Sequence, residues 1–131
     1  PLFWQILEGK NEIIFSIIEA IDEIDSGVIY SQEKLVLTGF ELNSEIREKQ
    51  AILTLKMCKN FIDNYKNIQN GKLQVGNPTY YPKRTKNDSE LQCHKSIAEQ
   101  FNLLRIVDNE SYPAFFTLGG KKYILKIYKE E

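Results

Sequence analysis

The carboxylate of Asp25 is the side chain whose type and position best suit chemistry in this sequence. It stands in the segment Glu23-Ile24-Asp25-Ser26-Gly27, which separates two apolar runs. A carboxylate on a loop that buried strands hold can take up or release a proton for a reacting group. The same residue types also favour an ordinary tight turn, because Asp bonds its own backbone and Gly accepts a positive φ. The residues alone leave both the catalytic and the turn interpretation open.

A second candidate site combines aromatic rings with cations, in the segment Tyr80-Tyr81-Pro82-Lys83-Arg84-Thr85-Lys86. Rings can stack on a nucleotide base, while Lys and Arg can bind phosphate oxygens. Pro82 argues against a central strand at this place, because proline cannot donate to a sheet ladder. The alternative is a solvated loop whose charges are incidental, which is common on protein surfaces.

Apolar periodicity predicts the elements that hold Asp25. Residues 13–18 and 28–37 are typical of β-strands, so Asp25 is expected on a strand-to-strand connection. Thr38 and Glu41 have the spacing of a capping box, which predicts that a helix follows. This helix is amphipathic, is expected to run for about 20 residues and packs on one side. Its predicted buried stripe comprises Leu42, Ile46, Leu53, Met57, Phe61 and Tyr65.

The remaining residues predict a connector, a second helix and a hairpin. Residues 66–77 are polar and rich in turn formers, which indicates a connector. Residues 88–92 offer caps for a helix that ends near residues 108–109, with Arg105 close to its end, where the macrodipole favours a cation. Residues 115–118 and 123–128 flank a Gly-Gly pair suited to a type I′ hairpin. The buried stripe of the second helix is expected at Ile97, Phe101 and Leu104.

Composition and charge narrow the classes of function. A chain of 131 residues has the length of a single domain with a core. Its apolar runs fall short of the roughly 20 residues that a membrane-spanning helix needs, which argues against a membrane partner. Residues 1–71 carry 7 basic and 11 acidic side chains (−4), whereas residues 72–131 carry 10 and 7 (+3). The second part therefore suits an anionic ligand, but its excess is too small for a dedicated nucleic-acid binder.

Cysteine usage indicates a reducing compartment. Cys58 and Cys93 are too few for a disulfide framework, and neither has a partner at zinc-site spacing. His94 directly follows Cys93, and adjacent side chains on a helix cannot ligate one metal together. We therefore expect a cytoplasmic protein without a metal. The chain has no secretory segment and begins at Pro1 rather than Met, which predicts a piece of a longer protein.

Four motifs in a fixed order connect these features. They are Pro1-Leu2-Phe3-Trp4, Glu23-Ile24-Asp25-Ser26-Gly27-x-Ile29, Tyr81-x-Lys83-Arg84-Thr85-x-x-Asp88-Ser89 and Leu104-Arg105-x-x-Asp108-Asn109-x-x-Tyr112-Pro113-Ala114-Phe115. Together they resemble the C-terminal part of a folate-dependent formyltransferase, over almost the whole chain. The resemblance is strongest to sugar N-formyltransferases, which formylate the amine of a nucleotide-linked amino sugar. Methionyl-tRNA formyltransferase is the next most similar.

The resemblance implies an α/β fold in two parts. Residues 1–71 are expected to be the C-terminal part of a Rossmann-like formyltransferase domain, with strands, the Asp25 loop and the long helix. Residues 72–131 are expected to form a small α+β subdomain with a nucleotide-binding loop, a helix and a β-hairpin. An isolated hairpin is marginally stable, so this one is expected to pair with a sheet or to join two subunits into a homodimer.

The implied reaction moves a formyl group from 10-formyltetrahydrofolate to the amine of a nucleotide-linked amino sugar, with dTDP as the expected nucleotide, in lipopolysaccharide or O-antigen biosynthesis. Asp25 matches the catalytic Asp of the family. The family's catalytic Asn and His, and most of the folate site, would precede Pro1, so the isolated chain is expected to be inactive. His94 lies in the wrong half to replace that His. The implied folate-binding residues are Ile21, Asp22, Glu23 and Ile24, and the implied substrate-binding residues are Tyr81, Lys83, Arg84, Asn102 and Arg105.

Two other functions stay open at this stage. The chain could belong to a methionyl-tRNA formyltransferase, although only 60 residues follow Gly71 and their positive charge is modest. It could also be a non-catalytic module in which the hairpin makes a dimer and the basic loop holds a nucleotide.

Overall fold

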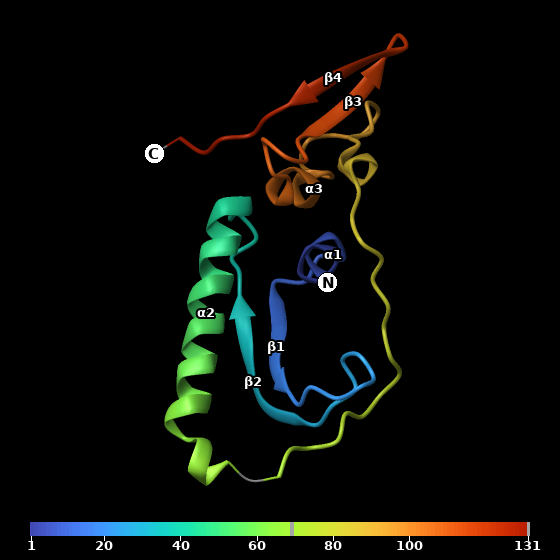
Figure 1. Ribbon diagram of the computed structural model, residues 1–131. Helices are drawn as coiled ribbons and strands as arrows, with labels where there is room; N and C mark the ends of the chain where they lie inside the picture. Colours follow the sequence, from blue (N-terminus) through green and yellow to red (C-terminus); the bar gives the residue numbers. More distant parts are fainter. Residues whose placement is uncertain (69, 131) are drawn as a thin grey trace. The chain divides into compact units, whose positions relative to one another are not determined.

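The computed structural model describes residues 1–68 and 70–130, which form two compact units. Unit 1 contains Pro1–Asn11, Leu37–Arg47 and Tyr81–Glu131, and unit 2 contains Glu12–Val36 and Glu48–Tyr80. Each unit therefore joins segments that are distant in the sequence (Figure 1). The sequence-based boundary at residue 71 concerns the domains of a longer protein, and it stays a prediction.

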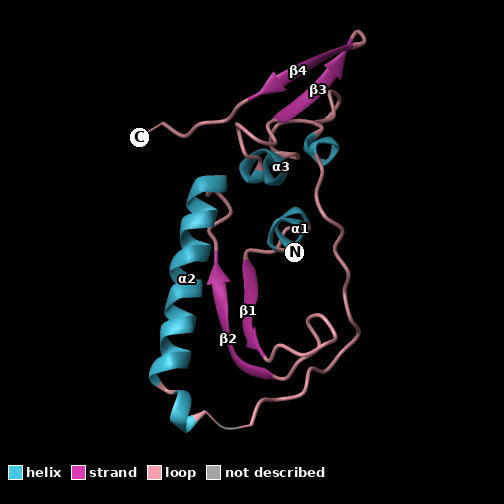
Figure 2. Ribbon diagram, in the orientation of Figure 1, coloured by secondary structure: helices cyan, strands magenta, loops and turns pink. Residues whose placement is uncertain are grey.

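Unit 2 contains an antiparallel pair of strands whose register follows the sequence pattern. Strand β1 covers Glu12–Ile18 and β2 covers Ile29–Val36, which confirms both predicted strands (Figure 2). Glu12 lies opposite Val36, and the register shifts by one residue between Ile17 and Ile18. This irregularity lies at the end of β1, where the loop that carries Asp25 begins.

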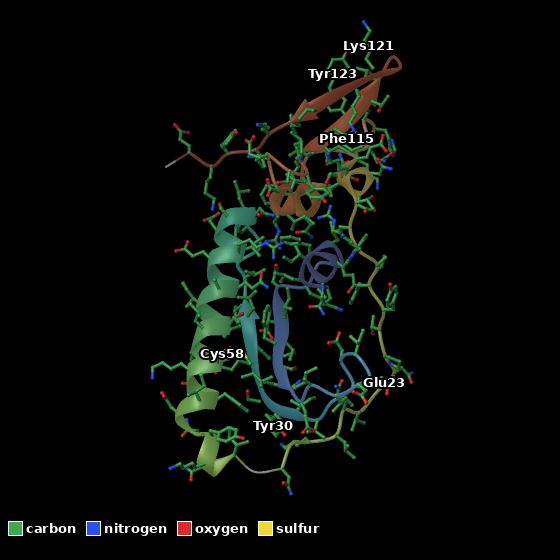
Figure 3. The ribbon with its side chains drawn as sticks, in the orientation of Figure 1. Glu23, Tyr30, Cys58, Phe115, Lys121 and Tyr123 are labelled. Atoms are coloured by element: carbon green, nitrogen blue, oxygen red, sulfur yellow. The ribbon has the colours of Figure 1, made fainter. Side chains whose placement is uncertain are left out.

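The long helix is confirmed as helix α2, Asn43–Asp63. Its predicted inward positions Ile46, Leu53 and Met57 are buried, and the Phe61 ring lies 5.7 Å from the Tyr30 ring of β2. In Figure 3, Tyr30 is labelled on β2 and Cys58 on α2. The predicted last member of the stripe was wrong: Tyr65 lies beyond the helix in a short 3₁₀ turn, Tyr65–Asn67, and is 69% exposed.

The capping box expected at Thr38 forms only in part. Glu41 does accept the backbone N–H of Thr38, at 2.8 Å and 3.0 Å from its two oxygens, but α2 begins two residues after Glu41. Glu45 accepts the N–H of Leu42 at 2.8 Å and so serves the start of the helix. Glu41 instead closes the turn at Gly39, whose φ of +95° only glycine adopts readily.

Unit 1 begins with a helix that periodicity could not predict. Helix α1, Leu2–Leu7, has only six residues, which is too short to show an amphipathic period. Its Leu2 and Ile6 are buried. Helix α3 covers Phe101–Ile106 and follows a 3₁₀ helix at Lys86–Ser89. A buried cluster around α3 comprises Leu91, Leu104, Val107 and Ala114, with Leu103, Phe116 and Ile127 packed against it.

The second helix is much shorter than the sequence predicted, and its expected inward residue Ile97 is 71% exposed. Before α3, a side chain rather than a helical N–H group donates hydrogen bonds to the backbone carbonyls. The Gln100 amide donates to the carbonyl oxygens of Gln92, Lys95 and Ser96 at 3.1–3.3 Å. Such bonds between side chain and backbone compete with helical ones, so regular structure starts only at Phe101.

The hairpin is confirmed, with strands β3, Ala114–Leu118, and β4, Lys121–Leu125. Gly119 and Gly120 have φ of +58° and +72°, which is the combination that a type I′ turn requires. Strand β4 starts and ends earlier than predicted. Residue 127 is held instead by Asn109, whose amide donates to the Ile127 carbonyl at 2.7 Å and accepts its N–H at 3.1 Å. Figure 3 labels Phe115, Lys121 and Tyr123 on this hairpin.

Arg105 lies inside unit 1 with none of its side chain exposed. Its Nε donates to Asn102 at 2.8 Å and its Nη2 to Asn11 at 3.0 Å, while Nη1 lies 3.7 Å from the Glu41 carboxylate. Burial lowers the pKa of Arg105, and the charge of Glu41 acts in the opposite direction. The Arg105 cation thus ties three distant segments of unit 1 together.

Replacing Glu41 with Gln should destabilise the chain strongly, because it leaves the Arg105 charge buried without a counter-ion. We expect the free energy of unfolding, measured by denaturant titration, to fall by about 3–5 kcal/mol. The same substitution at Glu110, which forms an exposed pair with Lys126, should change it by no more than about 0.5 kcal/mol. Equal effects of the two substitutions would contradict a structural role for the buried pair.

Candidate functional site

The Asp25 loop lies between β1 and β2, as the sequence predicted, and its backbone is held from outside the loop. The side-chain amide of Gln74 donates to the carbonyl oxygens of Asp25 and Gly27, both at 2.7 Å. Glu19 closes the base of the loop by donating its N–H to Val28 at 2.9 Å. Figure 3 shows Glu23 on this loop. Gln74 comes from the segment predicted to be a connector, so pattern alone did not reveal this role.

Asp25 is the only non-glycine residue with a positive φ, 58°, among the residues that the structure describes. Asp tolerates this left-handed conformation because its short polar side chain adapts to it. Gly27 is buried, and a Cβ at this position would lie 1.9 Å from the carbonyl oxygen of Glu19. The turn interpretation and the catalytic interpretation are therefore compatible, because the turn holds the Asp25 backbone in one conformation.

The Asp25 carboxylate is exposed and forms no hydrogen bond or ion pair with any residue in ranges 1–68 and 70–130. It can therefore contact a reacting group. Beside it, Ile21 and Ile24 expose 49% and 86% of their surface, and Asp22 and Glu23 are exposed as well. Two backbone carbonyls of this stretch are engaged within the loop: that of Glu23 accepts the N–H of Ser26 at 3.4 Å, and that of Ile24 accepts the Ser26 hydroxyl at 3.2 Å.

Replacing Gly27 with Ala should distort the Asp25 loop, because the added Cβ cannot fit beside the Glu19 carbonyl. We expect the unfolding free energy to fall by about 1–3 kcal/mol, as in other overpacked sites. Proteolysis at residues 21–26 should also become faster than in the parent chain. The adjacent Ser26→Ala, which removes only a 3.2 Å bond to Ile24, is the control and should change neither measurement notably. A Gly27→Ala chain as stable as the parent would contradict the close contact.

The second candidate site is a loop held by α1. Trp4 donates its indole N–H to the Pro82 carbonyl at 2.7 Å, and the Tyr81 hydroxyl donates to the Glu8 carboxylate at 2.9 Å. This bond raises the pKa of Tyr81. Sequence reasoning missed the anchoring roles of Trp4 and Glu8, although Trp4 belongs to one of the four motifs. The hydroxyl of Tyr81 is thus engaged with α1.

Arg84 is half-buried and follows this anchored loop. Its Nη2 donates to the Asp88 carbonyl at 2.9 Å, and its guanidinium carbon lies 5.9 Å from the centre of the Trp4 ring. Its Nε is buried without a hydrogen-bond partner among the described residues. Burial lowers the pKa of Arg84, against the effect of the Asp88 charge. Lys83 and Arg84 both border a cavity of about 380 Å³ in unit 1.

Asn102 and Arg105 do not line the cavity that Lys83 and Arg84 border. They bond to each other at 2.8 Å, and Arg105 is fully buried. The structure therefore brings Lys83 and Arg84 to one cavity but places Arg105 in the interior, where it stabilises the fold. Substrate contact by Asn102 and Arg105 stays a prediction that this burial does not favour.

Other chemistry-bearing side chains form no cluster in the described part of the chain. Cys58, Cys93 and His94 are exposed, and nowhere in residues 1–68 and 70–130 do three His, Cys, Asp or Glu side chains meet as metal ligands would. No helix in these residues is long and apolar enough to cross a membrane.

Comparisons with known proteins support the resemblance. No protein-family profile matches the chain. A methionyl-tRNA formyltransferase of Lactobacillus johnsonii is 26% identical over 133 residues, which cover 98% of this chain and 41% of the relative. A Mycobacterium tuberculosis structure described as a likely sugar N-formyltransferase matches 100% of this chain and 59% of its own, with a TM-score of 0.79 at 16% identity. The fold is that of the formyltransferases.

A third solved structure, HypX of Aquifex aeolicus in complex with tetrahydrofolic acid, matches 96% of this chain and 22% of its own, with a TM-score of 0.66 at 17% identity. The chain thus corresponds to a part of each formyltransferase or folate-bound protein that it matches, and it spans 41% of the curated relative. The comparisons also bear on the acceptor. The relative in sequence acts on a tRNA and the neighbour in structure is described as acting on a sugar, so formyltransferase similarity alone does not choose between them.

Proposed function

We propose that the protein containing this chain transfers a formyl group from 10-formyltetrahydrofolate to the amine of a nucleotide-linked amino sugar, with dTDP as the expected nucleotide. The observation that carries the proposal is Asp25: an exposed carboxylate without a bonding partner among the described residues, on a loop fixed by Gln74 and Gly27. It lies in a chain with the formyltransferase fold over its whole length. The neighbour bound to tetrahydrofolic acid supports a folate cosubstrate.

In this proposal Asp25 handles the proton of the attacking amine. The amine loses a proton as it bonds to the formyl carbon, and Asp25 accepts it directly or through a water molecule. An Asn and a His from a preceding segment of the complete protein would stabilise the developing oxyanion, and the Asp25 charge would keep that His protonated. As the oxyanion collapses, the bond between the formyl carbon and the folate nitrogen breaks, that nitrogen receives the proton that Asp25 took up, and tetrahydrofolate leaves. Residues 21–24 would line the pterin. We expect the isolated chain to be inactive, because its sequence holds no Asn-x-His segment.

The nucleotide part of the substrate is assigned to the anchored loop in unit 1. Lys83 and Arg84 border one cavity and can bind phosphate oxygens, Arg84 with a forked guanidinium and Lys83 as a point charge. The Tyr81 hydroxyl is engaged with the Glu8 carboxylate at 2.9 Å, so Lys83 and Arg84 carry the assignment. This arrangement supports a nucleotide-linked acceptor.

Methionyl-tRNA is the second candidate acceptor, and the Lactobacillus johnsonii relative favours it. Parallel assays of the complete protein with a dTDP-linked amino sugar and with charged initiator methionyl-tRNA would separate the two. The proposal expects formylation of the sugar. Transfer to the tRNA alone, with strong and salt-sensitive tRNA binding, would reverse the assignment.

The hairpin supports a further part of the proposal, a cytoplasmic homodimer that is joined through β3 and β4. Every residue of β4 is exposed, and Leu118 and Ile124 expose 59% and 64% of their surface. Apolar surface and unpaired strand edges favour association with a second copy. Sedimentation of the complete protein tests this: a strictly monomeric protein would contradict it. A dimer that binds the nucleotide sugar without formylating it would support the non-catalytic alternative.

The cytoplasmic part of the proposal is supported by Cys58 and Cys93, because exposed, unpaired cysteines suit a reducing compartment.

Replacing Asp25 with Asn in the complete protein should lower kcat by about 10²–10⁴, the range expected for loss of a proton-transfer group. The amide keeps the shape of the carboxylate but cannot accept the proton, so the KM values should change little. Asp63→Asn, at an exposed ion pair with Lys59 in α2, is the matched control and should keep full activity. An Asp25→Asn protein with the kcat of the parent would contradict the catalytic assignment.

Replacing Lys83 with Ala should selectively weaken the binding of the nucleotide sugar. We expect its KM to rise by about tenfold, because a charge-assisted contact to phosphate is lost, while the KM for the formyl donor stays the same. Lys95→Ala removes an exposed cation of the same unit away from the cavity and serves as the control. Steady-state kinetics with each substrate varied in turn provide the measurement, and equal rises in both KM values would count against a phosphate contact.

A further inference from the structure

We propose that Arg47, at the start of α2, is a third cation of the cavity that Lys83 and Arg84 border, and that this cavity binds the diphosphate of a nucleoside diphosphate group. The inference rests on the proposed function for the identity of the substrate. The binding site itself follows from unit 1, because Arg47, Lys83 and Arg84 all line the same 380 Å³ cavity. Neither the motifs nor the spacing of the sequence singled out Arg47.

The Phe3 ring orients Arg47. The guanidinium carbon of Arg47 lies 4.4 Å from the centre of this ring, which also lines the cavity. A guanidinium that lies over an aromatic face keeps its plane and directs its N–H groups sideways, so less rotamer freedom is lost when it binds a phosphate. Phe3 belongs to the first of the four motifs, and this contact gives the motif a physical role.

Arg84 is held in place beside the cavity. Its Nη2 donates to the Asp88 carbonyl at 2.9 Å, and its guanidinium carbon lies 5.9 Å from the centre of the Trp4 ring. A guanidinium that is already held in place loses less rotamer freedom when it binds a phosphate. Lys83 adds an exposed charge on the same loop.

One carboxylate, that of Asp108, lines the cavity together with the three cations. Asp108 accepts the backbone N–H groups of Ser111 and Glu110, each at 2.9 Å, and these bonds lower its pKa, as does the charge of Arg47 to a smaller extent. One oxygen of its carboxylate is therefore engaged in its own turn. With three cations and one carboxylate, the side chains that line the cavity carry a net charge of +2, which suits a diphosphate.

The walls and the size of the cavity indicate more than inorganic phosphate. Ile106 and Val107 border the cavity but expose only 1% and 4% of their surface, so its accessible apolar wall comes mainly from the rings of Phe3 and Tyr112, the latter 40% exposed. A volume of about 380 Å³ lies within the range of small-molecule sites. The combination of cations with an apolar wall fits a diphosphate that carries a nucleoside.

Calorimetric titration of the complete protein with dTDP, and separately with inorganic pyrophosphate, tests the assignment. Arg47→Gln should raise the dissociation constant of dTDP about tenfold or more. Arg47→Lys should raise it less, because Lys keeps the charge but not the forked geometry of the guanidinium. Pyrophosphate should show the same order, since the contact is to phosphate oxygens. Lys95→Gln, which removes an exposed cation of unit 1 that does not line the cavity, is the charge-matched control and should bind dTDP within about twofold of the parent.

The outcomes separate this inference from the proposed function. Suppose that Arg84→Gln weakens dTDP binding tenfold while Arg47→Gln and Arg47→Lys bind dTDP as tightly as the parent. The assignment of Arg47 is then overturned, and the formyltransferase proposal is untouched. If dTDP binding depends on Arg47 but no formyl transfer is found, the inference stands and the proposed function fails. A protein that binds neither dTDP nor pyrophosphate overturns the site. Should Arg47→Gln fail to fold in circular dichroism, Arg47→Lys alone decides.

Discussion

Unit 1 depends on the burial of one cation. Arg105 has no exposed surface, so its charge must be met inside the protein, and Asn11, Asn102 and Glu41 together meet it. An unmatched buried charge costs several kcal/mol, which makes this set of contacts strongly interdependent. The partners come from three separate segments of the chain. The same three segments also line the cavity that Lys83 and Arg84 border, so the contacts of Arg105 hold together the parts of unit 1 that form its walls.

Both candidate sites use loops whose backbone is held by residues far away in the sequence. Gln74 fixes the carbonyl groups around Asp25, and Trp4 fixes the carbonyl of Pro82 before the basic loop. In each case the bond goes to the backbone next to the functional residue rather than to its side chain. The carboxylate of Asp25 and the charge of Lys83 thus stay available while their position is set, as a site of fixed geometry requires.

Sequence patterns predicted the long elements well and the short ones poorly. Helix α2 spans six turns, so its apolar period is repeated often enough to be recognised. Helices α1 and α3 have six residues each, and no period can show in so short a segment. The error at Ile97 has a different cause, because the Gln100 side chain bonds backbone groups that a helix would have used. The hairpin turn was predictable because Gly119 and Gly120 permit the positive φ values that it needs.

By itself, the sequence determined the identity of the candidate chemical groups: a carboxylate on a strand-to-strand loop, and cations beside aromatic rings. Local residue types carry that information, since turn geometry and charge are properties of a few neighbouring residues. Only the tertiary structure decided which cations lie together. It placed Arg105 in the core, where desolvation requires fixed partners, and it brought Arg47 to the cavity of Lys83 and Arg84. Such grouping depends on contacts between distant segments, which spacing along the chain cannot express.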